Sequence, residues 1–376
     1  MKFLIIILGL LSCINCIANS AENQVILCPS LWQAYLKQFY QADGRIIDSG
    51  VEPNTTSSEA QAYSLFMSLI ENDQSTFNTI LAWTQTNMAR KDLAQNLPGW
   101  SWGKRTDGSW AILDRNSASD ADLWLAYTLF QAGTLWKEPK FTSLAHSILE
   151  NIKRNEIVNI PGFGIMLTPA PSGFVTDKTW RINPSYLPPQ LMQYFQKVDP
   201  TGPWKILKKN TIRVYSTFPK GLVPDWLIFE RGKGWVYIYP EWSTGSYDAI
   251  RTYMWVGMLD PHDPSKIRLL RSLSGMLRVL NASNNNPPHK VNTYNGNIEL
   301  GAPPGFSAAL IPYVKSLGET ESLSRQNQII KLNFKNCQIG ERPRYYDQIL
   351  ALLGLGWNEG RFSFAKDGSL MPYWLH

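Results

Sequence analysis

The sequence contains few of the residues that most often build metal and redox sites. Its 376 residues include four His and four Cys. Cys13 and Cys16 fall in an N-terminal leader, and Cys28 and Cys337 lie far apart, so no spacing of Cys and His indicates a zinc site. We therefore expect no metal and no cofactor. In an exported chain the last two cysteines would form one disulfide or remain two buried thiols, and the sequence does not decide between them.

Long apolar runs and long basic runs are also missing. The longest apolar run, residues 3–12, is too short to span a bilayer, so stable membrane insertion is not expected. The net charge is +6, but no run of five or more Lys or Arg suggests a nucleic-acid-binding tail. Motifs of serine hydrolases (GxSxG) and of nucleotide-binding folds (the P-loop, or GxGxxG after a strand) are absent.

The N-terminus has the form of an export signal. Lys2 precedes an apolar segment from Phe3 to Leu11, and Ala18-Asn19-Ser20 fits a signal peptidase site. We expect residues 1–20 to be a signal peptide and residues 21–376 to form one periplasmic or secreted domain. A lipoprotein box ending at Cys13 is the alternative, and we favour it less because a polar stretch directly follows Ser20.

Apolar residues recur at helical spacing along most of the chain. One run is Ala62, Leu65, Phe66, Leu69 and Ile70. The same spacing predicts helices within residues 74–90, 118–136, 141–152, 186–197, 245–259, 266–280, 305–317 and 344–355. Strand signals are few, and the clearest lies in residues 226–239, where a Gly-Lys-Gly sequence at 232–234 could turn a hairpin. Many helices and no linker predict a single all-α domain whose paired helices could close into a ring.

Aromatic residues are abundant, with 15 Trp, 16 Tyr and 15 Phe. Several lie in loops rich in Gly and Pro, for example in residues 97–103 and 301–306. A tryptophan ring offers a flat apolar face and one N–H donor, which suits ligands with apolar faces and polar edges. Sugar rings and nucleobases both fit that description.

Three segments place acidic residues at the start of predicted helices. Glu59 follows a run of Ser and Thr, Asp120 lies among small residues, and Asp248 precedes Arg251 by three positions. Taken singly, each fits an ordinary cap, a helix-dipole partner or a surface ion pair. Together with the aromatic residues, they indicate a glycoside hydrolase, which needs one acid and a second carboxylate.

These segments resemble glycoside hydrolase family 8. Residues 118–126, followed by Ala132 and Trp136, look like the family signature, and further matching segments keep their order from about residue 28 to the C-terminus. They are residues 83–85, 113–116, 183–189, 224–226, 247–251 and 305–309. The resemblance implies an (α/α)6 barrel, with a few short strands in its loops, that hydrolyses β-1,4-glucan with inversion. It extends to members encoded with bacterial cellulose synthase, which makes the cellulose synthase complex a partner to test.

The resemblance also implies roles for individual residues. Glu59 maps to the general acid, Asp248 to the general base, and Asp120 to the aspartate that holds the distorted sugar at the point of cleavage. The remaining residues assigned to substrate binding are Tyr186, Arg251, Trp102, Tyr247 and Asn183.

The sequence departs from the family pattern beside the proposed acid, at Ala60, Ala62 and Ser64. These differences affect the shape of the sugar subsites more than the chemistry. Two alternatives stay open at this stage. One is a related specificity for xylan, mixed-linkage glucan or chitosan, and the other is a glucan-binding protein without catalysis.

Overall fold

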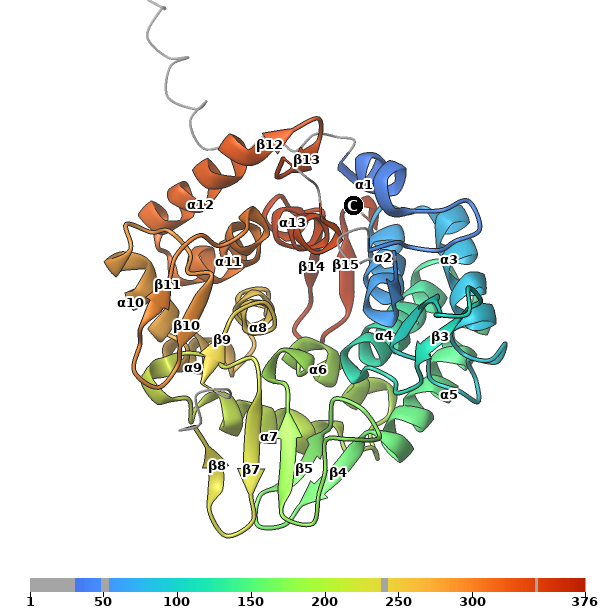
Figure 1. The fold of residues 1–376 in the computed structure, drawn as a ribbon, viewed down its shortest axis with the longest axis horizontal. Helices are drawn as coiled ribbons and strands as arrows, with labels where there is room; N and C mark the ends of the chain where they lie inside the picture. Colours follow the sequence, from blue (N-terminus) through green and yellow to red (C-terminus); the bar gives the residue numbers. More distant parts are fainter. Residues whose placement is uncertain (1–30, 49–53, 238–242, 342–343, 376) are drawn as a thin grey trace, which may run out of the picture.

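The computed structural model describes residues 31–48, 54–237, 243–341 and 344–375. Within these ranges, six helices form an inner ring in which each contacts the next, and the last contacts the first. In ring order they are α2 (Ser58–Ile70), α4 (Ser119–Leu135), α6 (Pro189–Val198), α8 (Ala249–Gly257), α11 (Pro304–Leu317) and α13 (Tyr345–Asn358). Figure 1 shows this ring around the centre of the molecule.

A second layer of helices surrounds the ring and packs pairwise on it. These outer helices are α1 (Leu31–Phe39), α3 (Gln74–Asn87), α5 (Pro139–Asn155), α7 (Trp204–Tyr215), α9 (Lys266–Ser272), α10 (Gly275–Ala282) and α12 (Thr320–Asn333). Helix α1 contacts α13, α9 contacts α8, and each of the others except α10 contacts the inner helix that precedes it. The architecture is an (α/α)6 barrel in one domain, as predicted.

The two layers differ in how many sides of each helix are covered. Every residue of α8 is buried, and α2 buries all of its residues except Glu59. The outer helix α5 instead buries one stripe, which includes Phe141, Ala145, Ile148 and Ile152. A helix that is apolar on all sides belongs inside a fold, whereas an amphipathic helix covers its surface.

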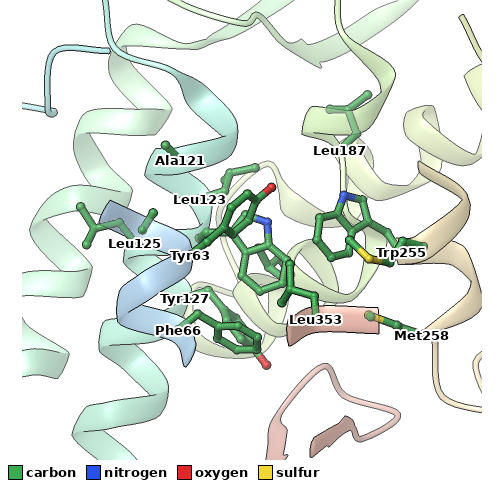
Figure 2. Close-up of a cluster of buried hydrophobic side chains, with 14 of the residues drawn as sticks. Tyr63, Phe66, Ala121, Leu123, Leu125, Tyr127, Leu187, Trp255, Met258 and Leu353 are labelled. Carbon is green, nitrogen blue, oxygen red and sulfur yellow. The ribbon is translucent and has the colours of Figure 1, made fainter. Parts of the chain in front are cut away.

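Large aromatic side chains pack together where the inner helices meet. Figure 2 shows Tyr63, Phe66, Tyr127 and Trp255 converging from α2, α4 and α8. Trp124 of α4 packs against the same residues, with its ring centroid 4.8 Å from that of Phe66 and 5.0 Å from that of Trp255. The centre of the barrel is therefore a packed aromatic core.

The strands are two to five residues long and form small antiparallel sheets in the loops. Two three-stranded sheets flank the site described below. The first joins β1 (Thr56–Ser57), β2 (Ser101–Lys104) and β3 (Trp110–Asp114), and the second joins β6 (Thr179–Ile182), β7 (Leu227–Glu230) and β8 (Gly234–Val236). The β7–β8 hairpin confirms the turn predicted at residues 232–234.

The remaining strands lie elsewhere around the barrel. They are β4 (Ile157–Ile160), β5 (Gly164–Leu167), β9 (Thr244–Gly245), β10 (Lys290–Asn292), β11 (Ile298–Glu299), β12 (Phe334–Lys335), β13 (Gln338–Ile339), β14 (Phe362–Phe364) and β15 (Leu370–Pro372).

Three helices, α1, α7 and α12, were not predicted from the sequence. In α12 the buried positions are largely polar, because Ser322 and Gln326 face inward and donate hydrogen bonds to Asn285. A helix that packs through polar side chains lacks apolar residues at helical spacing, so the sequence pattern does not reveal it. The helix expected over residues 266–280 is divided into α9 and α10 by a turn at Leu273, whose carbonyl accepts a hydrogen bond from the Tyr313 hydroxyl of α11 (2.8 Å).

The predicted signal peptide and Cys28 lie outside the described residues. Cys337 is disulfide-bonded, which excludes a free thiol at that position. In the part of the chain that the structure describes, no helix is both long enough and apolar enough to cross a bilayer.

We predict that Gly354→Ala weakens the packing of α13 on α11. A Cβ atom at Gly354 would lie 2.0 Å from the Ala308 carbonyl oxygen, so the two backbones would have to separate. Overpacking of this kind costs about 1–3 kcal/mol of unfolding free energy, which chemical denaturation can measure.

Gly356→Ala in the same helix is the matched control. Its added Cβ would meet no atom closer than 3.5 Å, so we expect no loss, or a gain of about 0.4–1 kcal/mol. Equal effects of the two substitutions would contradict the close approach at Gly354.

Candidate active site

A cavity of about 590 Å³ opens at one end of the barrel. The first turns of α2 and α13 and the residues directly before α4 and α8 contribute to its lining. Its volume lies within the range usual for small-molecule sites. The acidic lining residues are Asp48, Glu59, Asp114 and Asp248, and the aromatic ones are Trp100, Phe174, Tyr186, Trp226, Tyr345 and Tyr346.

The Arg251 guanidinium joins three carboxylates at the floor of this cavity. Its Nη1 donates to Glu59 and to Asp120 Oδ2 (3.3 Å), and its Nη2 donates to Asp248 Oδ1 (2.6 Å). The three acids come from the starts of α2, α4 and α8, so closure of the ring brings them together. The structure thus unites the three acidic residues that the sequence singled out with the arginine predicted beside the base.

The three carboxylates differ in their access to the cavity. The side chains of Glu59 and Asp248 are 17% and 27% exposed, whereas those of Asp120 and Arg251 are each 2% exposed. Glu59 and Asp248 can therefore meet a ligand directly. Asp120 lies beneath them and is not part of the cavity lining.

Burial favours the protonated forms of Glu59 and Asp120. It raises the pKa of Glu59, the nearby Asp248 charge raises it further, and Arg251 opposes the shift. Burial likewise raises the pKa of Asp120 to about 8, against the attraction of Arg251. One guanidinium cannot balance three neighbouring carboxylates that are buried or partly buried, so the cluster retains a proton near neutral pH.

The local structure around Glu59 leaves its carboxylate free for the cavity. Ser57 caps α2 by accepting the Ala60 N–H (3.1 Å), so Glu59 is not needed as a cap. Two residues later, Gln61 accepts the Ile46 N–H (2.8 Å) and donates to Thr84 Oγ1 (2.9 Å), which fixes the first turn of the helix. The buried neighbours thus fix the backbone at Glu59, while its side chain faces the cavity.

Aromatic side chains form a wall of the cavity near Asp248. Phe174 and Trp226 lie nearly parallel, with centroids 5.9 Å apart, and the Arg181 guanidinium lies 4.0 Å from the centre of the Trp226 ring. Tyr186, which the sequence predicted, also lines the cavity, and its ring centre lies 5.6 Å from the Arg251 guanidinium carbon. Such surfaces can stack against the apolar faces of sugar rings.

Trp102 lies apart from this wall. It stacks on Trp110 (5.1 Å between centroids) and meets the Trp83 ring edge to face. Ser101 lines the cavity, whereas Trp102, the next residue of β2, is not part of its lining. Trp100, which is 46% exposed, lines the cavity, so it replaces Trp102 as the candidate stacking residue of this loop.

Asn183 and Tyr247 also lie outside the cavity lining. Asn183 is buried, and its Oδ1 accepts both the N–H and the hydroxyl of Ser185 (3.0 and 2.8 Å). Ser185 in turn accepts a hydrogen bond from Arg251 Nη2 (3.1 Å), so Asn183 lies behind Ser185 and Arg251, outside the cavity lining. Tyr247 is 40% exposed, and its carbonyl accepts the hydroxyl of Tyr346.

Several lining residues were missed by reasoning from the sequence. Tyr345 and Tyr346 begin α13, and nothing in the local pattern separates them from ordinary core aromatics. Asp114 and Trp226 did fall within segments that match the family, but no role was assigned to them. Across the described ranges, no three His, Cys, Asp or Glu side chains are grouped so as to hold a metal ion.

We predict that Arg251→Met destabilises the protein increasingly as the pH rises. Removal of one partner from a buried ion pair costs about 3–5 kcal/mol. Without the guanidinium, the pKa values of Glu59 and Asp120 in the folded protein rise further above their unfolded values. Stability that depends on their protonation is then lost as the pH rises through the folded pKa values.

The measurement is the unfolding free energy of variant and wild type between pH 5 and pH 8. Arg361→Met, which breaks the pair with Glu71 at the far end of α2, is the control and should show a smaller dependence on pH. A deficit for Arg251→Met that stays constant with pH would contradict the charge balance described above.

Comparison with known proteins shows which family this chain belongs to. The sequence model described as glycosyl hydrolases family 8 matches residues 2–360. An endoglucanase of Escherichia coli strain K12 is 41% identical over 344 residues, which cover 91% of this chain and 90% of that protein. An endoglucanase of Xanthomonas axonopodis pv. citri is also 41% identical, over 92% of this chain and 89% of that protein.

A solved structure agrees with these sequence relatives. The endo-1,4-D-glucanase of Vibrio fischeri ES114 superposes with a TM-score of 0.83 at 35% identity, over 92% of this chain and 99% of that one. The family model covers nearly the whole chain and the relatives match it over almost their full length. The chain therefore belongs to glycosyl hydrolases family 8.

Proposed function

We propose that the protein is an endo-1,4-β-glucanase that hydrolyses β-1,4-glucan with inversion of the anomeric carbon. The observation that carries this proposal is the pair of cavity-facing carboxylates, Glu59 and Asp248, held on different nitrogens of one buried guanidinium. The names of the family members that match this chain over most of its length support the substrate class.

Glu59 is the proposed general acid. An acid that protonates a leaving oxygen must keep its proton until the bond breaks, and burial raises the pKa of Glu59 in the required direction. Its partial exposure lets it reach the glycosidic oxygen, and its fixed helical turn holds it in place. The ion pair with Arg251 gives the carboxylate a partner once the proton has left.

Asp248 is the proposed general base. It is the more exposed of the two acids, and its hydrogen bond from Arg251 Nη2 holds the carboxylate at the cavity, where a general base must accept a proton from water. Inverting glycosidases place the two carboxyl groups about 6.5–9.5 Å apart, which leaves room for that water. The guanidinium between Glu59 and Asp248 keeps them from touching one another.

Asp120 has a supporting role in the proposed mechanism. At 2% exposure it is too enclosed to serve as acid or base, and its carboxylate accepts hydrogen bonds from Arg251 and from the Ala121 N–H (2.8 Å). We assign it to hold the guanidinium under the other two acids. Its contact with the sugar at the point of cleavage, which the family resemblance implies, stays a prediction.

The cavity and its walls support cleavage within chains. Trp100, Phe174 and Trp226 lie around an open cavity and could hold several sugar units on either side of the two acids. Internal cuts would lower the viscosity of a soluble cellulose derivative faster than they release reducing ends. Release of one small product from chain ends would instead favour an exo-acting enzyme.

We also propose export to the periplasm or beyond, and action beside a cellulose synthase complex. Support for export comes from the leader at residues 1–20, and support for the partner comes from the family resemblance alone. The intact mass of protein from its native envelope tests the leader, because a lipid on Cys13 or a retained Met1 would contradict it. Co-purification with the synthase tests the partner.

We predict that Glu59→Gln and Asp248→Asn each remove most activity on a soluble β-1,4-glucan while the fold remains intact. Each amide keeps the shape of the side chain but cannot exchange the proton. General acid–base catalysis contributes about 10²–10⁴-fold, so kcat should fall by that order. The measurement is release of reducing sugar, with circular dichroism to confirm the fold.

Glu71→Gln is the matched control, because Glu71 follows the last residue of the same helix α2 and pairs with Arg361. It should retain activity. Substantial activity in Asp248→Asn would assign the base to another residue.

We predict that hydrolysis inverts the configuration of the anomeric carbon. Hydrolysis of a β-linked glucan by an inverting enzyme yields the α-anomer first. Proton NMR during the first minutes, before mutarotation, distinguishes the two anomers. Initial release of the β-anomer would show a retaining mechanism and overturn the roles given to Glu59 and Asp248.

A further inference from the structure

The start of helix α8 is capped by a residue from another loop. The first N–H groups of a helix have no partner within the helix, and an Asp at the N-cap usually accepts one of them with its own carboxylate. Asp248 occupies the N-cap of α8, yet its side chain makes no such bond. Its carboxylate instead binds Arg251 and faces the cavity.

Asp225 accepts the N–H groups of this turn. Its Oδ1 takes those of Ser246 (2.8 Å), Asp248 (3.1 Å) and Ala249 (2.8 Å). The backbone N–H of Asp225 in turn donates to the Thr244 carbonyl (2.8 Å), so the two segments are linked in both directions. One carboxylate oxygen therefore fixes the peptide units on both sides of Asp248.

The segment that carries Asp225 is docked closely on α8. The N–H of Val223 donates to the hydroxyl of Tyr253, a fully buried residue of α8 (2.9 Å). The Val223 carbonyl oxygen would lie 2.2 Å from a Cβ at Gly245, so the approach requires glycine there. Asp225 itself does not line the cavity, although the next residue, Trp226, does.

We propose that Asp225 is a positioning residue for catalysis: by satisfying the N–H groups at the start of α8, it leaves the Asp248 carboxylate free to act on water. This inference rests on the proposed role of Asp248 as the general base. If Asp225 were absent, the Asp248 carboxylate would be the nearest acceptor for the N–H groups of its own helix, and it would turn away from Arg251.

The test compares two substitutions at Asp225. Asp225→Ala removes the acceptor, so we expect kcat on a soluble β-1,4-glucan to fall on the order of 100-fold, the usual effect of a catalytic group displaced by about 1 Å. KM should change little because Asp225 does not touch the cavity. Asp225→Asn keeps an oxygen at the same place, and it should restore kcat to within a few-fold of the wild type with an unchanged profile of kcat against pH.

Asp73→Ala is the matched control for stability. Asp73 caps α3 by accepting the Thr76 N–H (3.0 Å), away from the cavity. It should lower the melting temperature as Asp225→Ala does, but leave kcat unchanged. A loss of kcat in Asp73→Ala equal to that in Asp225→Ala would reduce the role of Asp225 to general stability and overturn the proposal.

Three further outcomes would overturn it. They are a kcat within a few-fold of wild type in Asp225→Ala, a loss in Asp225→Asn as large as in Asp225→Ala, and a rise in KM with kcat unchanged. Asp248→Asn is measured alongside. If that variant is active, the assignment of the base has failed, whereas an inactive Asp248→Asn with an active Asp225→Ala rejects only the positioning role.

Discussion

The bonds from Arg251 to three carboxylates are the constraint on which the active site depends. One buried positive charge faces Glu59, Asp120 and Asp248, so the cluster cannot ionise fully without leaving uncompensated charge inside the protein. Buried ion pairs add little to stability compared with apolar packing. The cluster is better understood as a device that keeps a proton on one acid while a neighbouring acid stays ionised.

The barrel supplies the geometry that this cluster needs. The acids lie at the starts of α2, α4 and α8, where helix dipoles favour negative charge, and the packed aromatic core beneath them prevents the helices from sliding. At the starts of α2 and α8 other residues do the capping, Ser57 for the first and Asp225 for the second. The carboxylates of Glu59 and Asp248 therefore do not serve as helix caps.

Most of the helices and most of the site residues could be predicted from the sequence, and the predictions that failed did so for physical reasons. The inner helices were found because they carry many apolar residues, among them residues at helical spacing, while α12 was missed because Ser322 and Gln326 pack through hydrogen bonds. Trp100 and Ser101 line the cavity while Trp102 does not, and the register shift of the β2–β3 pair between 101 and 102 breaks the simple alternation from which their sides could have been predicted.

Contacts between distant segments were beyond prediction from local patterns. Asp225 lies 23 residues before Asp248, in a loop whose sequence does not indicate which N–H groups it meets. Asn183 was expected on the substrate, yet it holds Ser185, which meets Arg251 from a third segment. Motifs identified the residue types of the site, whereas only the fold revealed which of them support the others.

The ring closes where the last inner helix, α13, packs against the first, α2. The cavity is consequently lined by residues from both ends of the chain, with Glu59 at one end and Tyr345 and Tyr346 at the other. Contacts so distant in sequence form late in folding, because a long loop must be closed before they contribute. A growing chain therefore contains its acids before it contains Tyr345 and Tyr346, and the lining of the cavity is complete only when synthesis of the chain is nearly finished.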